Sequence, residues 1–337
     1  MKVLGSLICA LGGIPAAVRE LEAGGYDGAY CAEINNDPFL PALLAAGHSE
    51  RIEIGTAIAV AFARNPMTTA QSAHDLNEYA HGRFVLGLGS QVQAHVTRRY
   101  GMPWSQPAAR MREFILALRA IWACWHDGTP LRFEGEFYRH TLMTPMFVPA
   151  TRAFPPPRVR LAGVGPRMTA VAAEVADGLI AHGFTTARYL REVTAPALAE
   201  GLARAGKRRE QIEVIAPIMV VTGEDEAGFL RSREAVRAQL AFYASTPAYA
   251  GVLALHGWEA LGQELTALSK AGRWAEMGAL VDDAMLGTFA VVCERPEQVP
   301  AELRARYAGL IDGWMCTVAL ADRERQHALV RAVRDSP

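Results

Sequence analysis

Short, nearly continuous apolar segments alternate along the chain with longer segments whose apolar positions recur at helical spacing. The short segments are rich in Val, Ile, Leu and small residues, which is typical of parallel strands covered on both faces. We expect eight strands, over residues 3–8, 28–34, 52–60, 83–89, 158–164, 178–184, 212–221 and 311–318. Helical segments lie between them, so the pattern predicts repeated strand–helix units.

Eight such units are the number that a closed (β/α)8 barrel, or TIM barrel, requires. A doubly wound open sheet is the competing α/β architecture, but it has fewer strands and usually a second domain. We therefore predict one barrel domain over residues 1–337, with insertions over about 90–157 and 223–310. Both segments follow strands, so we expect them at the C-terminal face of the barrel, where insertions usually cover a substrate.

The composition limits the kinds of molecule that the protein is expected to bind. The formal net charge is −1 and the Lys and Arg residues are dispersed, which predicts no nucleic-acid or anionic-membrane surface. No apolar run has the length of a spanning helix, and the first residues resemble a strand rather than a signal peptide. The five cysteines are scattered without a Cys-x-x-Cys pair, as in reduced proteins. We expect a cytoplasmic protein that acts on a small organic molecule.

Several familiar catalytic patterns are missing. No His-x-His or His-Glu-x-x-His spacing occurs, which argues against a zinc or binuclear metal site, and there is no Gly-x-Ser-x-Gly elbow. Two glycine pairs begin like dinucleotide fingerprints, but Val92 and Met168 stand where the third glycine belongs. We therefore expect neither a metal nor a classical NAD domain.

Residues with binding potential gather where the predicted strands end. Glu33 ends the second strand, where its carboxylate either accepts hydrogen bonds from a bound heterocycle or caps the next helix. The third strand ends in small residues around Ala57 and Ile58, which let backbone approach a flat ligand or simply fill the barrel. Ser90 and then His95 follow the fourth strand. These positions predict one end of a binding groove, the end at which a flat heterocycle would lie.

The fifth and sixth strands supply a second set. Gly163, Val164 and Gly165 precede a proline at a helix start, where backbone N–H groups form an anion site or the dipeptide merely begins the helix. His182 and Gly183 close the next strand. A groove with a heterocycle end and a phosphate end suits a flavin-like mononucleotide better than a metal.

These residues resemble the luciferase-like monooxygenase superfamily, and within it the coenzyme F420 (deazaflavin)-dependent oxidoreductases. The resemblance covers nearly the whole chain and rests on the order and spacing of modest motifs. They lie at residues 23–28, 51–56, 64–66, 82–89, 100–101, 107–113, 162–166 and 176–178.

The resemblance implies a (β/α)8 barrel with an extended insertion and a groove that holds coenzyme F420. It implies a bulge at Ala57-Ile58, often with a non-prolyl cis peptide, behind the ring. Glu33 matches the acidic residue near the ring and His95 a polar contact to the cofactor tail. The backbone of residues 163–165 matches the phosphate cradle, with His182 and Gly183 nearby.

The sequence departs from the family at two positions. Ile34 stands where many relatives have a histidine after the acidic residue, and Val92 where some sugar-phosphate-oxidising relatives have a glutamate. No catalytic acid can be assigned at position 34, and sugar-phosphate oxidation is not expected. For proton transfer the hypothesis falls on His95, Glu33 or a tyrosine such as Tyr100.

We expect an F420-dependent oxidoreductase that transfers a hydride between deazaflavin and a small hydrophobic substrate. Two alternatives stay open: an FMN-dependent monooxygenase that needs a partner reductase, and a non-catalytic flavin- or deazaflavin-binding protein. A homodimer is expected by analogy with the family. The first insertion supplies apolar residues for a substrate wall or for its own packing: Trp104, Phe137, Tyr138, Met143, Met146 and Phe147.

Overall fold

A closed ring of eight parallel strands forms the centre of the computed structural model, which describes residues 1–335. Each strand pairs with the next one in the ring, and the last returns to the first. In order around the barrel they are β1 (Lys2–Ser6), β2 (Gly28–Cys31), β3 (Glu53–Thr56), β5 (Phe84–Gly89), β8 (Arg158–Gly163), β9 (Gly178–Ala181), β10 (Glu213–Ala216) and β13 (Gly313–Met315). The predicted TIM barrel is confirmed.

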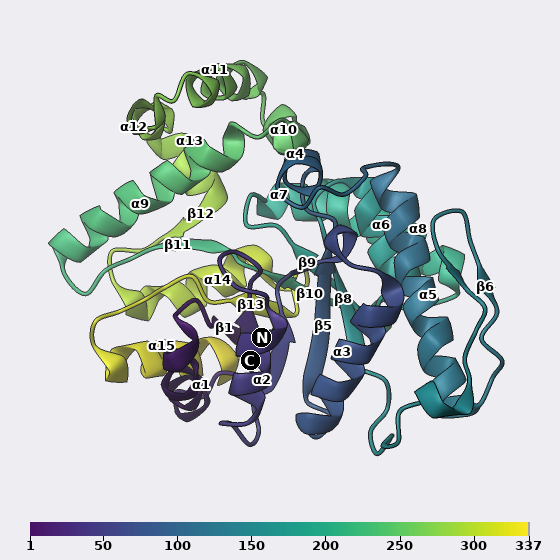
Figure 1. The fold of residues 1–337 in the computed structure, drawn as a ribbon. Helices are drawn as coiled ribbons and strands as arrows, with labels where there is room; N and C mark the ends of the chain where they lie inside the picture. The colour runs from purple at the N-terminus through teal and green to yellow at the C-terminus, as the bar shows by residue number, and fades with distance from the viewer. Residues whose placement is uncertain (336–337) are drawn as a thin grey trace.

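Helices surround this ring (Figure 1). They are α1 (Ile14–Ala23), α2 (Phe39–Ala46), α3 (Pro66–Tyr79), α5 (Pro107–Asp127), α6 (Pro166–Val175), α8 (Ala195–Ala205), α14 (Val299–Tyr307) and α15 (Arg323–Asp335). Helix α5 packs between α3 and α6, and α14 packs on α15. Both predicted insertion segments therefore include one helix of the outer ring, and the parts that leave the barrel are shorter than 90–157 and 223–310.

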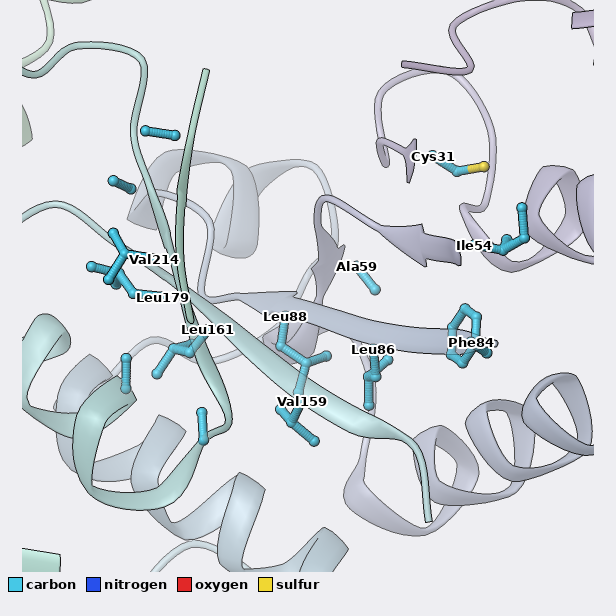
Figure 2. Close-up of a cluster of buried hydrophobic side chains, with 14 of the residues drawn as sticks. Cys31, Ile54, Ala59, Phe84, Leu86, Leu88, Val159, Leu161, Leu179 and Val214 are labelled. Carbon is cyan, nitrogen blue, oxygen red and sulfur yellow. The ribbon is translucent and has the colours of Figure 1, made fainter. Parts of the chain in front are cut away.

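Alternate side chains along each strand point outward to the helices or inward to the barrel axis. Figure 2 shows outward-facing residues such as Leu86 and Leu88 of β5 beside Val159 and Leu161 of β8. These positions belong to one large apolar cluster beneath the helices. The inward positions form a second, smaller cluster that fills the barrel: Leu4, Tyr30, Ile180, Ile215 and Met315.

Charged side chains close the N-terminal end of the barrel. Arg160 is 1% exposed, and its Nη1 lies 2.8 Å from Glu53 Oε1 while its Nε donates to Glu213 Oε2 at 2.9 Å. Burial raises the pKa of Glu213, but Arg160 and Lys2 outweigh that effect and lower it. Because a paired ionic layer occupies this end, the C-terminal end is the one left for a ligand.

Two predicted strands are each divided in two. The third, 52–60, consists of β3 and the short β4 (Ala59–Val60), separated by a cis peptide at Ala57-Ile58, the position that the family resemblance implied. Beside the break, the Thr56 hydroxyl donates to Gly87 O at 2.7 Å and accepts from Gly87 N at 2.9 Å. The side chain thus replaces regular pairing between β3 and β5 at the bulge.

The seventh predicted strand, 212–221, is divided into β10 and β11 (Met219–Val221). Strand β11 leaves the barrel and pairs with β12 (Ala290–Val292). We call residues 219–292 the lid. It holds α9 (Glu226–Ala244), α10 (Ala250–Ala254), α11 (Glu259–Lys270), α12 (Trp274–Met277) and α13 (Asp283–Phe289).

The lid lies on the same side of the barrel as α4 (Gln93–Arg98) and α7 (Ala187–Tyr189), which follow the C-terminal ends of strands (Figure 1). It has a hydrophobic core of its own, to which Phe184 and Tyr189 contribute from the loop and helix after β9. Of the helices within residues 1–335, none combines the length and apolar character needed to cross a bilayer.

The first insertion does not roof the barrel in the way the sequence suggested. Its hairpin, β6 (Phe133–Glu134) with β7 (Arg139–His140), lies beside α5 (Figure 1). Tyr138 packs edge-on against Phe114 of that helix, with ring centroids 5.4 Å apart. Met146 and Phe147 are mostly exposed to solvent. Tyr138 thus packs on the outer flank of the barrel, and Met146 and Phe147 do not form part of a buried wall.

Candidate cofactor site

Glu33 is tied to the bulge after β3. Its backbone N–H donates to Ile58 O at 3.2 Å. Its Oε2 accepts from Val60 N and from Arg64 Nη1, both at 2.7 Å, and its side chain is only 7% exposed. A charge-assisted pair in so sheltered a place fixes the carboxylate. Glu33 therefore holds the end of β2 against the bulge.

The second oxygen of Glu33 faces the segment after β5. Tyr100 donates its hydroxyl proton to Glu33 Oε1 at 2.9 Å. Burial raises the pKa of Tyr100, and the hydrogen bond to Glu33 raises it further, so the phenol stays protonated at neutral pH. Next to it, Arg99 Nη2 donates to Ile34 O at 2.7 Å. Two contacts thus clamp the segment after α4 onto the end of β2.

The three candidates for proton transfer do not lie together. Glu33 and Tyr100 lie in direct contact, whereas His95 is exposed on α4. Ile34 is 51% exposed at the same end of β2. Ser90 Oγ donates to Gln91 O at 3.1 Å, in a turn where Gln91 has φ 62°.

The start of α6 forms the opposite end of the predicted groove. Gly163 pairs with Ala181 between β8 and β9, and Gly165 is the N-cap residue of α6 with no side chain capping it. The first N–H groups of a helix have no partner within it. A Cβ placed on Gly165 would meet no atom within 4 Å. This uncapped helix start is open on the side where an anion would bind.

His182 follows β9 beside that helix start. Its Nδ1 accepts from Phe184 N at 3.0 Å. Its ring lies 4.4 Å from the Tyr249 ring and 4.7 Å from the Tyr243 ring, measured between centroids. Burial lowers the pKa of His182 to about 4. The imidazole is therefore neutral at physiological pH, and because Nδ1 is an acceptor, the proton is on Nε2.

Two hollows in the surface lie away from this rim. One of about 490 Å³, lined by residues such as Arg158, Asp177 and Asp312, lies at the N-terminal end of the barrel. Another of about 800 Å³, lined by Glu224, Phe229 and others, lies at the foot of α9. Neither is lined by a residue predicted for the site. The candidate site therefore stays at the rim, where the residues predicted from the sequence lie.

The structure brings residues to the rim that sequence reasoning left out. Arg64 was noted only as part of a motif, yet it neutralises Glu33 and also pairs with Asp37, at 2.6 Å. Tyr243 and Tyr249 come from the lid, more than 60 residues after His182 in the chain. No local pattern marks these tyrosines, because their contact with His182 depends on how the lid packs.

Comparison with known proteins identifies the family of the chain. The luciferase-like monooxygenase family matches residues 9–313. An uncharacterised protein of Mycobacterium tuberculosis is 49% identical over 99% of this chain and 98% of its own. A putative coenzyme F420-dependent oxidoreductase of the same organism is 28% identical over 82% of each chain.

A solved structure shares the fold. The coenzyme F420-dependent tetrahydromethanopterin reductase from Methanopyrus kandleri superposes with a TM-score of 0.78 at 20% sequence identity, covering 98% of this chain and 96% of that one. At that identity the likeness concerns the fold alone, but the family match covers most of the sequence. The chain belongs to the luciferase-like monooxygenase family.

Proposed function

We propose that this protein is an F420-dependent oxidoreductase that transfers a hydride between deazaflavin and a small hydrophobic organic substrate. The observation that carries the proposal is the uncapped start of α6 after β8, with His182 at the end of the neighbouring strand β9 and Glu33 at the same end of the barrel. Two relatives and a structural neighbour whose names include F420 support this choice.

The residues fit such a cofactor in charge and shape. The backbone N–H groups after Gly165 suit a phosphate oxygen. The bulge at Ala57 and Ile58 offers an apolar surface to a flat ring, with the Glu33 carboxylate at its edge. When bound, deazaflavin supplies hydride chemistry at a ring carbon. The protein's part is to orient the ring, exclude water and hold the polar groups around it.

Tyr100 and Glu33 are the pair that we propose for proton exchange with the substrate. Of the three candidates for proton transfer, Tyr100 and Glu33 are the two that share a hydrogen bond. His95, which is exposed on α4, fits better as a contact to the cofactor tail. Ser90 and Gly183 complete the proposed contacts along the rim.

Equilibrium binding tests the proposal. The purified protein is titrated with F420 and with FMN, and quenching of cofactor fluorescence is recorded. We expect saturable binding of F420 and turnover of reduced F420 with members of a panel of alcohols, aldehydes and activated enones. Tight FMN binding with none for F420 would replace the proposal by a monooxygenase that needs a reductase. A saturated site without any turnover would favour a binding protein.

The homodimer and the cytoplasmic location expected from the sequence stay predictions. Light scattering of the purified protein tests the first, and fractionation of the source cells tests the second.

A further inference from the structure

Residues 151–155, which we call the strap, connect the first insertion to β8 without regular secondary structure of their own. Prolines stand at positions 155–157 just before β8, and a proline has no N–H to donate to a strand ladder. Helices α3 and α5 lie side by side on the barrel (Figure 1), and both contact the strap. The polar backbone groups of the strap therefore depend on side chains and helix ends for their partners.

Helix α3 supplies partners for two carbonyl groups of the strap. His74, which is 1% exposed, has its Nε2 at 3.0 Å from Thr151 O. A carbonyl oxygen can only accept a hydrogen bond, so Nε2 of His74 carries a proton. One turn further along the helix, Asn77 Nδ2 donates to Pro155 O at 2.9 Å. Two buried side chains on one face of α3 thus hold both ends of the strap.

The middle of the strap is held by a carboxylate and by the end of α5. Glu78 accepts hydrogen bonds from the backbone N–H groups of Ala153 and Phe154, both at 3.0 Å. Arg152 Nη1 donates to Trp125 O at 3.0 Å. This carbonyl is in the last turn of α5, where carbonyl groups have no partner within the helix. The whole strap is therefore closed over the two helices by side-chain contacts.

His126 of α5 lies in the same cluster but has no such contact. Its ring centroid is 5.6 Å from that of His74, and its Nε2 is shielded from solvent without a hydrogen-bond partner among residues 1–335. Burial lowers the pKa of His126, and the nearby His74 and Arg152 lower it further. The carboxylates of Asp127 and Glu78 act in the opposite direction but do not cancel this effect. His126 is therefore neutral at physiological pH while the strap is closed.

Protonation of His126 is disfavoured only in the closed state. A buried cation without a partner is costly, and the closed strap offers its Nε2 no acceptor. When the strap is open, water reaches the imidazole and its pKa returns to about 6.5. The open state then binds a proton that the closed state does not. Opening therefore becomes more favourable as the pH falls below about 6.5.

We propose that the strap is a pH-sensitive closure, which stays on α3 and α5 while His126 is neutral and is released when His126 takes up a proton. Release loosens the connection between the first insertion and β8 but leaves the barrel folded. The contacts that hold the strap lie within the chain itself, so its release does not depend on whether the protein binds F420.

Hydrogen exchange of the strap, measured by mass spectrometry, follows its release. Exchange is recorded at pH 7.5, 6.5 and 5.5 for the wild type, His126→Phe and His48→Phe, and each rate is divided by the rate of an unstructured chain at the same pH. His126→Phe keeps a ring in place but cannot titrate. His48→Phe is the matched control, because His48 is exposed and contacts Leu44 O. Thermal melting checks that each variant is folded.

In the wild type we expect the strap to open about five- to tenfold more at pH 5.5 than at pH 7.5, the change that one histidine with a pKa of about 6.5 in the open state produces. In His126→Phe this increase should be absent, whereas His48→Phe should follow the wild type. The phenyl ring leaves no buried nitrogen without a partner. At pH 7.5 the strap of His126→Phe should therefore be protected at least as well as that of the wild type.

The same pH dependence in the wild type and in His126→Phe would overturn the inference, as would a wild-type strap whose protection does not change with pH. An equal loss of protection in β5 and β8 would indicate unfolding of the barrel, and would also overturn it. An NMR titration of the His126 imidazole in the wild type needs no folded variant. We expect a midpoint below pH 6.5, and a midpoint at or above that value would contradict a neutral histidine under a closed strap.

Discussion

Protonation of His182 should destabilise the folded protein. Burial lowers the pKa of this imidazole from 6.5 to about 4. Between these values the folded chain binds fewer protons than the unfolded chain, so the free energy of unfolding falls as the pH drops below 6.5 and stops falling near pH 4. From pH 7 to pH 5 the loss from this one group amounts to about 2 kcal/mol.

His182→Asn isolates this contribution. The asparagine oxygen can still accept the N–H two residues ahead, as Asx turns do, but it does not titrate. Its poorer packing against the two tyrosines lowers stability by the same amount at every pH, so that cost cancels when slopes are compared. Urea unfolding at pH 7, 6 and 5 gives the free energy of unfolding for the wild type and for His182→Asn. The control is His48→Asn, the same change at an exposed histidine.

We expect the variant to lose about 2 kcal/mol less than the wild type between pH 7 and 5, and the control to follow the wild type. Parallel curves for the wild type and His182→Asn would show that the imidazole titrates normally. In that case burial does not hold the imidazole neutral, and the lowered pKa of His182 would be refuted.

Other substitutions test the remaining contacts. Arg64→Met leaves the Glu33 carboxylate buried without its cation and should cost about 3–5 kcal/mol in urea unfolding; adding Glu33→Gln should restore part of that loss, and additive losses would contradict the pairing. Gly87→Ala places a Cβ 1.8 Å from a backbone oxygen and should give insoluble or unfolded protein. A Cβ at Gly165 meets no atom within 4 Å, so Gly165→Ala should melt within a few degrees of the wild type. Phe289→Ala should cost about 3–5 kcal/mol and, by hydrogen exchange, loosen the lid more than the barrel; uniform loosening would refute a separate lid core.

The sequence predicts the barrel well because its signal is repetitive. Each strand is a short apolar run followed by a helix, and eight repeats leave few architectures. The breaks inside two runs are harder to see. Residues 57–58 are as apolar as their neighbours, and the Thr56 hydroxyl that replaces strand pairing there carries no periodic signal. Pro217 does mark the other break, because proline cannot donate to a ladder and is rare inside a central strand.

Part of the candidate site can likewise be predicted from the sequence, and part cannot. Positions at strand ends, such as Glu33, Gly165 and His182, follow from the order of the strands, since all parallel strands end on one face. Contacts made by the insertions do not follow from it. Tyr249 reaches His182 only because the lid folds over β9, and the hairpin with Tyr138 lies beside α5 instead of over the mouth. Such placements depend on tertiary packing that no window of sequence records.

The apolar core of the lid is shared with the barrel, since Phe184 stacks on Phe289 with centroids 4.5 Å apart and Tyr189 lies in the same cluster. Two residues of the loop and helix after β9 are therefore structural members of a segment that begins 30 or more positions later in the chain. Anyone transplanting this lid onto a related barrel would need to carry that stretch with it, because residues 219–292 alone would leave an unfilled hole where Phe184 inserts. The segment that could be exchanged between related barrels therefore consists of two separate parts of the chain. Side-chain packing, and not continuity of the sequence, determines which residues belong to it.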